Sequence, residues 1–298
     1  MKKFTYRSSK FIGFLFLFLL VLFSILFFQK KESFSLEKHN IIIGDSNTRW
    51  GINDSILADY QNYSTGGETY LFALTKLKML DKDNKIDTLM LSFNPHNIIN
   101  NVWWDDSSQT PLLNRMPALY NYFSFEDHLA VMKQTPKNYG ASFIKIGKSG
   151  IYNLLSLERE DKMFKFGSFI PVKGKNTNDT IFSHKVPAKI CDFEVSYLKK
   201  IKKECDAKNI KLILIQPPKN NHSSRYPFYN FGEFYDIYRK DFGNVDFLDF
   251  SKMNIPEKYF WDIFHLNDKG ADYFSQFLKE NKIKNLLNSE YNQKAKLN

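Results

Sequence analysis

The sequence is poor in cysteine, since its 298 residues include only Cys191 and Cys205. Both fall on one expected helix, and their separation of fourteen positions would place them roughly 21 Å apart, too far for a disulfide bond. Their spacing is not typical of a metal site, and no internal repeat is visible. These absences exclude a disulfide-stapled small domain and a repeat architecture, while cysteine content leaves the compartment undecided.

Acidic residues are missing from the first 31 positions, which hold six of the 42 lysines and arginines. Without this stretch the chain has 36 basic and 32 acidic residues, so most of the net charge of +10 belongs to the amino terminus. The remaining basic residues are dispersed, and the lysine-rich run at 199–203 is typical of a solvated helix face. We therefore expect no nucleic-acid partner.

The same stretch contains an uncharged run of eighteen residues at 11–28, FIGFLFLFLLVLFSILFF. As a helix it would be about 27 Å long, enough to cross a hydrocarbon core. Its end, Leu26-Phe27-Phe28-Gln29, lacks the small-x-small cleavage site of a signal peptide. Residues 1–31 are therefore predicted to be an uncleaved transmembrane anchor. A cleaved signal peptide or a buried core helix is the less favoured alternative.

Basic residues are more numerous before this run than directly after it. The positive-inside rule then places the amino terminus in the cytoplasm and the rest of the chain outside the cell membrane. A short polar linker is expected at 32–40.

The remainder alternates strands with helices. Buried strands are predicted at 41–43, 61–64, 86–93, 211–216 and 245–250. Helices are expected at 53–60, 68–80, from Ser124 with Asp127 in the capping position, 188–209, 226–242 and 267–280. The pattern predicts a three-layer α/β domain over 41–285, with an insertion at about 97–187 that includes an extended loop or hairpin at 164–180. A polar tail is expected at 286–298.

Two polar motifs follow the first two strands. GDSN at 44–47 places Ser46 on a tight strand-to-helix turn, where its hydroxyl would be exposed and its amide could donate to an oxyanion. STGGET at 64–69 contains Gly67, whose backbone N–H could approach a substrate oxygen. Taken alone, the first is a common turn and the second a loop followed by a helix cap.

Two further motifs lie near the third strand and the last helix. In SFNPHN at 92–97, the amide of Asn94 could be another oxyanion donor, although an Asn-Pro turn explains the motif equally well. Asp262 precedes His265 by three residues, a spacing that lets a carboxylate orient a histidine base. A surface cap or a metal pair is the alternative, but no further His/Asp cluster has zinc-type spacing, so neither a metal nor another cofactor is expected.

In this order the motifs resemble the SGNH (GDSL-like) hydrolase superfamily. The blocks are GDS at 44–46, Gly67 in STGGET, Asn94 in SFNPHN, and DIFH at 262–265 followed by LNDKGA. The resemblance extends from Ile41 to about Leu278, apart from the middle of the chain.

This resemblance implies a flavodoxin-like sheet of five parallel strands. It also implies that Ser46 is the nucleophile, that Ser46, Gly67 and Asn94 form the oxyanion hole, and that Asp262 orients the base His265.

Three positions depart from the family pattern. Trp50 stands where the family usually has a glycine, and Ser92 and Pro95 replace its usual glycine and acidic residue in the third block. These departures concern the geometry of the substrate more than the triad. His96 is a possible rival base, ranked below His265 because no neighbour in the sequence obviously orients it.

An amino-terminal anchor followed by an SGNH domain is similar to the extracytoplasmic partners of membrane-bound O-acyltransferases. The expected function is that of a serine-dependent O-acyl esterase or acyltransferase, with acetyl favoured, acting on extracytoplasmic cell-surface glycans. A membrane-bound O-acyltransferase is a possible partner. Two alternatives stay open: a lipase- or thioesterase-like hydrolase, and a non-catalytic accessory subunit on the same scaffold.

Overall fold

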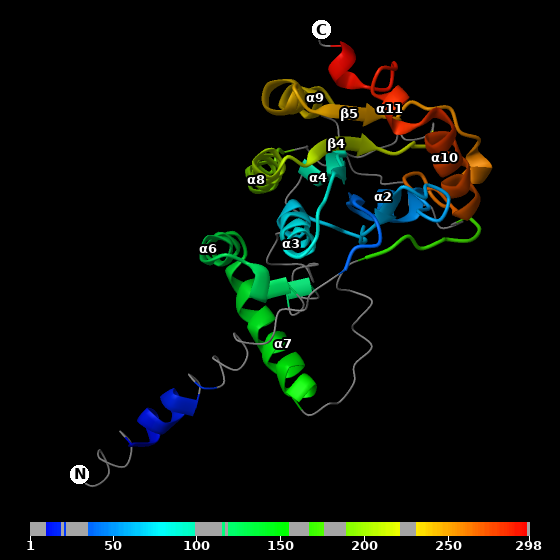
Figure 1. Ribbon diagram of the computed structural model, residues 1–298. Coiled ribbons are helices and arrows are strands. Elements are labelled where there is room, and N and C mark those ends of the chain that lie inside the picture. Colours follow the sequence, from blue (N-terminus) through cyan, green and yellow to red (C-terminus); the bar gives the residue numbers. More distant parts are fainter. Residues whose placement is uncertain are drawn as a thin grey trace.

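A parallel β-sheet organises the described part of the protein, as the computed structural model shows (Figure 1). Its five strands are β1 (Asn40–Ile43), β2 (Tyr60–Asn62), β3 (Thr88–Ser92), β4 (Lys211–Gln216) and β5 (Asp246–Asp249), arranged in the order β2-β1-β3-β4-β5. Every neighbouring pair is parallel. This is the strand order of flavodoxin-like folds, so the predicted five-stranded parallel sheet is confirmed.

The structure describes residues 10–18, 21, 35–98, 115–116, 119–154, 167–175, 189–220 and 231–296.

Helices cover both faces of the sheet. One face, which carries Ile41, Ile43 and Leu89, packs against α3 (Tyr70–Asp81), α8 (Asp192–Lys208) and α9 (Phe231–Ile237), the last of which continues into the π-helix η5 (Tyr238–Phe242). The other face, which carries Ile42 and Met90, packs against α10 (Asp268–Asn281) and α11 (Ile283–Leu286), and α10 contacts α2 (Ser46–Gly51). Because successive side chains of a strand point to opposite faces, the apolar run 41–43 supplies both cores.

One predicted helix, at 53–60, is wrong. The structure has turns there before β2 begins at Tyr60. The Asn53 side chain accepts a hydrogen bond from the Ser55 amide (3.0 Å), and the Asp54 carboxylate accepts one from the Asn62 amide (2.9 Å). Such local side-chain acceptors offer the backbone an alternative to helical hydrogen bonds.

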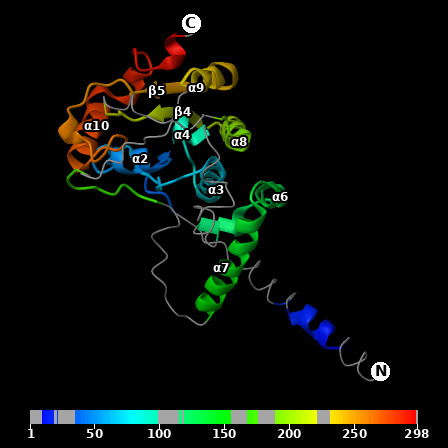
Figure 2. The same cartoon turned by 180° about the vertical axis from the view of Figure 1, so that it is seen from behind.

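The insertion predicted at about 97–187 lies between β3 and α8, the helix that precedes β4. Its described elements are α4 (Pro95–Ile98), the short 3₁₀-helix η2 (Tyr120–Tyr122), α6 (Phe125–Gln134) and α7 (Pro136–Leu154). The predicted helix start at Ser124 is confirmed, because Ser124 and Asp127 form both hydrogen bonds of a capping box. Helix α7 extends away from the sheet in both views (Figure 2), whereas α6 lies nearer the body, where the Tyr197 hydroxyl of α8 donates to the Asp127 carboxylate at 2.8 Å.

An extended strap formed by residues 167–175 returns from the insertion to the α/β body, as expected for a loop at 164–180. Its backbone donates to the carbonyl oxygens of Ser64 and Arg49 (both 3.2 Å), and the Val172 carbonyl accepts from the amide of Asp268 (2.8 Å). Gly167 has a φ of 78°, and a Cβ there would collide with the backbone of Ser64. The strap therefore joins β2, α2 and α10 across one side of the body.

The predicted polar tail, residues 286–298, is not simply solvated over its described part. The Asn292 side chain and the Tyr291 backbone bond to the edge strand β5. Asn292 Oδ1 accepts from the Phe247 amide at 3.1 Å, and the Tyr291 carbonyl accepts from the Asp249 amide at 2.8 Å. The 3₁₀-helix η7 (Gln293–Lys296) follows. This segment covers an edge that would otherwise expose unpaired backbone groups.

At the amino terminus, residues 10–18 are helical and exposed. Among the described residues, no helix is both long enough and apolar enough to cross a membrane. The predicted span at 11–28 falls partly on residues 19–20 and 22–28, which lie outside the described residues. Neither cysteine forms a disulfide bond, and both are buried.

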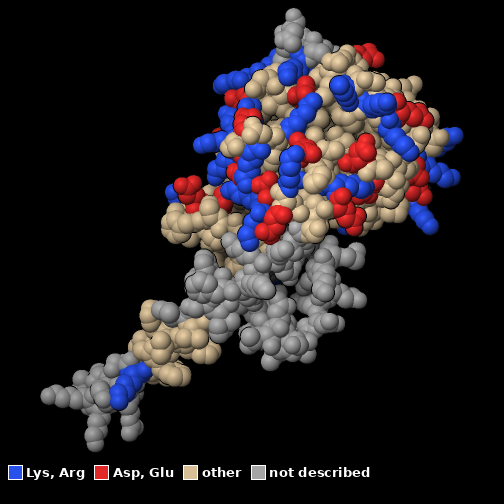
Figure 3. All heavy atoms as spheres, viewed as in Figure 1, with Lys and Arg blue, Asp and Glu red and all other residues tan. Residues whose placement is uncertain are grey.

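Acidic and basic side chains are intermixed over the described part of the α/β body on the face shown in Figure 3.

Candidate active site

The four sequence motifs meet at the carboxyl ends of β1, β2 and β3. Helix α2 begins at Ser46, directly after β1, and the strand order reverses between β1 and β3, the point at which open α/β sheets place their ligands. Gly44 lies so close to β3 that a Cβ there would collide with the side chain of Ser92. The close approach of β1 and β3 therefore requires a glycine at position 44, two residues before Ser46.

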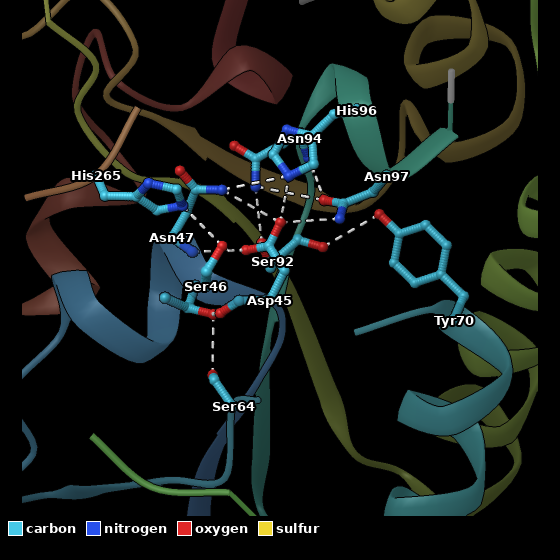
Figure 4. Close-up of polar contacts among 11 residues, drawn as sticks. Asp45, Ser46, Asn47, Ser64, Tyr70, Ser92, Asn94, His96, Asn97 and His265 are labelled. Atoms are coloured by element: carbon cyan, nitrogen blue, oxygen red, sulfur yellow. Dashed lines mark hydrogen bonds and ion pairs between the residues drawn. The ribbon is translucent and has the colours of Figure 1, made fainter. Parts of the chain in front are cut away.

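Ser46, His265 and Asp262 form a hydrogen-bonded chain. The hydroxyl Oγ of Ser46 lies 2.8 Å from Nε2 of His265, and Nδ1 of His265 lies 2.8 Å from Oδ2 of Asp262 (Figure 4 shows the first contact). If Nδ1 carries the proton and donates it to Asp262, Nε2 is left as an acceptor for the serine hydroxyl. The arrangement has the donor and acceptor sequence of a serine nucleophile with a carboxylate-oriented base.

Asp262 is itself held in place by the loop that precedes α10. Its Oδ1 accepts hydrogen bonds from the amides of Phe264 and His265, each at 2.7 Å. The exposed fractions of the His265 and Asp262 side chains are only 16% and 12%, so water has limited access to the pair. These two hydrogen bonds therefore hold the Asp262 carboxylate in the position from which it contacts the imidazole of His265.

Two tryptophans enclose the imidazole. The ring of Trp50 lies 4.5 Å from that of His265, centroid to centroid, with an interplanar angle of 56°. Trp261 meets Trp50 edge to face at 5.5 Å. Trp50, which stands where the SGNH pattern usually has a glycine, thus packs on the candidate base, a contact that no sequence pattern predicts.

The predicted oxyanion donors are placed differently from one another. Ser46 is the first residue of α2, so its amide has no carbonyl partner within the helix. Gly67 has a left-handed φ of 62° in the loop after β2. Asn94 is fully buried, and its amide nitrogen donates to Ser92 Oγ (2.8 Å) and Asn97 Oδ1 (3.3 Å). In this structure the Asn94 amide is therefore engaged with its own loop.

Asp45 is the hub of a second polar cluster, which the sequence did not reveal (Figure 4). Its buried carboxylate accepts from the Asn47 amide (3.0 Å), the Asn47 side chain (3.2 Å), Ser92 Oγ (3.1 Å) and Asn97 Nδ2 (2.9 Å), and it pairs with Nε2 of His96. Burial alone would raise the pKa of the Asp45 carboxyl, but His96, Asn97 and the Asn47 amide together hold it well below its usual range. Asp45 thus ties the loop after β1 to the loop after β3.

His96, the rival base, is oriented after all. The Asp45 carboxylate holds its Nε2, and burial lowers the pKa of the imidazole despite that carboxylate. It is His265, however, that reaches the Ser46 hydroxyl.

Lys219 is another buried group without a sequence signal. It follows β4, is 3% exposed, and interacts electrostatically with Asp45 and Asp249. Burial lowers the pKa of Lys219 to about 8, against the attraction of these two carboxylates. No three His, Cys, Asp or Glu side chains in the described part of the chain are grouped as metal ligands would be.

Comparison with known proteins adds little to this geometry. A family model without a functional description matches residues 172–288, which include Asp262 and His265. No curated protein matches. One solved structure that matches is a presumed acylhydrolase from Bacteroides fragilis, 11% identical, with a TM-score of 0.39 and coverage of 86% of this chain and 91% of that chain.

Proposed function

We propose that the chain is an SGNH-type serine ester hydrolase or acyltransferase, with Ser46 as nucleophile and His265, oriented by Asp262, as base. The proposal rests on one observation: the unbroken chain of hydrogen bonds from Ser46 Oγ through the imidazole to the Asp262 carboxylate. Ser46 Oγ would attack the ester carbonyl while its proton passes to Nε2 of His265. The same proton would then leave with the alcohol, and an acyl-enzyme would remain.

The second half of the reaction uses the same base. His265 would take a proton from water or from a sugar hydroxyl, whose oxygen attacks the acyl-enzyme. The bond between the acyl carbon and Ser46 Oγ then breaks, His265 returns the proton to Oγ, and the free acid or a new ester is released. The amides of Ser46 and Gly67 would stabilise the oxyanion. Asn94 would be the third donor, for which its amide must turn from Ser92 and Asn97 towards the substrate.

The proposed setting is the outer face of the cell membrane. An uncharged amino-terminal run of eighteen residues supports a single-pass anchor with the catalytic domain outside, and the SGNH resemblance supports an acyl ester of a cell-surface glycan as substrate, with acetyl favoured. A membrane-bound O-acyltransferase is the proposed partner that would supply or accept the acyl group.

A fluorophosphonate probe on the purified full chain in non-ionic detergent tests the serine mechanism. We expect the parent to be labelled and to release acetate from an acetyl ester. Ser46→Ala should not be labelled, and His265→Ala should be labelled at least about a hundredfold more slowly. Ser196→Ala, which changes an exposed serine on α8, is the matched control and should behave like the parent. A folded parent that is neither labelled nor active on any acetyl ester would contradict the proposal.

A further inference from the structure

Positive charge is concentrated around the loop that contains Gly66 and Gly67. Three cationic side chains, Lys76, Arg115 and Arg49, act on this loop, and one buried carboxylate, Glu68, accompanies them. The loop matters because Gly67 is a predicted oxyanion donor.

Two of the cations have structural partners. Lys76 is 1% exposed; its ammonium group donates to the Tyr63 carbonyl (3.0 Å) and the Thr65 hydroxyl (3.1 Å) and pairs with Glu68 Oε2. Arg115 donates to the other oxygen of Glu68 (3.0 Å) and to the Gly66 carbonyl. Both oxygens of the single carboxylate are therefore already engaged, and Lys76 and Arg115 are explained as supports of the loop.

Arg49 is different. It lies on α2, three residues after Ser46, and its Nη1 is 4.0 Å from the position that a Cβ on Gly66 would occupy. Burial and the charge of Arg115 lower the pKa of Arg49, and Glu68 offsets only part of this effect. Its buried Nε has no hydrogen-bond partner among the described residues. Arg49 is a half-buried guanidinium near that of Arg115, and both oxygens of the nearby Glu68 carboxylate already have partners. The positive charge of Arg49 is therefore not balanced by a nearby carboxylate of its own.

Residues three apart on a helix lie on the same side, roughly 5–6 Å apart at their Cβ atoms. An anionic group held by Arg49 would therefore be only a few bonds from an ester carbonyl at Ser46 Oγ. Planar guanidinium groups bind carboxylate and phosphate oxygens in a two-point geometry that suits such a contact.

We propose that Arg49, backed by Arg115, forms a subsite for a negatively charged group of the substrate, so that the ester cleaved or transferred at Ser46 belongs to an anionic molecule. The inference rests on the proposed function of Ser46 and narrows it to esters that carry a carboxylate or a phosphate close to the acylated hydroxyl. A neutral ester would leave the excess positive charge unmatched.

Three acetyl esters of one phenol framework test this: 4-acetoxybenzoate, 4-acetoxyphenyl phosphate and the neutral methyl 4-acetoxybenzoate. For the parent full chain in detergent, kcat/KM should be higher for at least one anionic ester than for the neutral one, and the preferred one tells carboxylate from phosphate. In Arg49→Gln the ratio of anionic to neutral kcat/KM should fall by about tenfold to a hundredfold, since a charge-assisted hydrogen bond is lost. In Arg49→Lys the ratio should lie between those of the parent and Arg49→Gln, because lysine keeps the positive charge but cannot donate two parallel hydrogen bonds.

Arg239→Gln is the matched control, since Arg239 is an exposed arginine whose guanidinium pairs with Asp236 on the surface. Its anionic-to-neutral ratio should equal that of the parent. An equal loss on all three esters in Arg49→Gln, or an unchanged ratio in a folded variant, would overturn the subsite. If Arg49→Gln does not fold by circular dichroism, Arg49→Met and Arg49→Lys decide the same ratio.

A second measurement does not depend on turnover. Sodium sulfate should raise the Tm of the parent and of Ser46→Ala, relative to sodium chloride of equal ionic strength, by more than it raises the Tm of Arg49→Gln. The rise that remains in Arg49→Gln is the general stabilisation by an excluded anion. An Arg49-dependent rise without any esterase activity would keep the anion subsite and reject the proposed function. Esterase activity with neither an Arg49-dependent rise nor an anionic preference would reject the subsite alone.

Discussion

Replacing Asp45 with asparagine tests whether the carboxylate that joins the β1 and β3 loops is a main support of the candidate site. The carboxylate of Asp45 accepts two hydrogen bonds at Oδ1, from the Asn47 amide and Ser92, and three at Oδ2, from His96, Asn97 and the Asn47 side chain. Asparagine offers one carbonyl oxygen and one NH₂ group, so it cannot accept at both positions. Its least costly placement puts the oxygen at the Oδ2 position and the NH₂ towards Ser92, whose hydroxyl can turn to accept.

The cost of that placement can be worked out. The Asn47 amide loses its acceptor, which is the N-cap hydrogen bond of α2 and contributes about 1 kcal/mol. The bonds from His96 and Asn97 lose their charge-assisted character, at roughly 1–3 kcal/mol in total. Because Asp45 is buried, solvent does not screen these terms. We expect the free energy of unfolding to fall by about 2–4 kcal/mol at pH 7.

Urea unfolding of the full chain in detergent, followed by circular dichroism, measures this loss as a lower midpoint at an unchanged m-value. Asp59→Asn is the matched control, because Asp59 is exposed, and it should change the free energy of unfolding by less than about 0.5 kcal/mol.

The difference between parent and Asp45→Asn should also depend on pH. The pKa of Asp45 is lower in the folded protein than its ordinary value near 4, so its contribution is complete above about pH 4 and is lost as the pH falls below that. At pH 3 the two proteins should therefore be closer in stability than at pH 7. A loss below about 0.5 kcal/mol at pH 7, or a difference that does not shrink in acid, would refute the reasoning.

Three further predictions concern the candidate site. Asp262→Asn should lower kcat on an acetyl ester by about 10³–10⁴-fold with little change in Tm, because its NH₂ would face Nδ1 of His265 and favour the wrong tautomer; a loss below about tenfold would count against the triad. Burial lowers the pKa of Lys76 to about 8, so this side chain loses its positive charge as the pH rises through that value. Sulfate binding at Arg49, measured by titration calorimetry, should therefore weaken a few-fold over the same pH range, and Lys76→Arg should remove this pH dependence. Gly44→Ala should lower the free energy of unfolding by more than about 3 kcal/mol in a thermal melt, whereas Gly140→Ala, where a Cβ meets nothing, should not destabilise the protein.

The sheet was predictable because its strands are short apolar runs that end at polar motifs. Ile41-Ile42-Ile43 is buried on both sides, and a short β-branched run of this kind is typical of a central strand in a parallel sheet. The helix expected at 53–60 failed because side-chain acceptors at Asn53 and Asp54 satisfy the local backbone more directly. Helix propensity does not take into account this competition between side-chain acceptors and backbone hydrogen bonds.

The candidate site was predictable only where its residues are adjacent in the sequence. Asp262 and His265 share one loop, so their pairing could be inferred from spacing. The pairing of Asp45 with His96, 51 positions away, depends on how closely β1 and β3 approach, and so does the requirement for Gly44. No local pattern carries that information.

The contact between Trp50 and His265 illustrates the same limit. In the sequence Trp50 is a departure from a family pattern, and in the structure it is a wall of the imidazole pocket. Arg115 likewise lies far along the chain from Glu68, so their ion pair could not be foreseen.

The hydrogen bond between Ser46 and His265 joins residues 219 positions apart, one after the first strand and the other after the last. A contact of such long sequence separation forms only when the chain between its partners has closed, so we expect it to form late in folding. The candidate nucleophile would then meet its base only once the first and last strands are both in the sheet. Quenched labelling of Ser46 during refolding would then report when the whole chain has come together. The circular dichroism signal, which responds to helices as soon as they form, would rise earlier than this labelling.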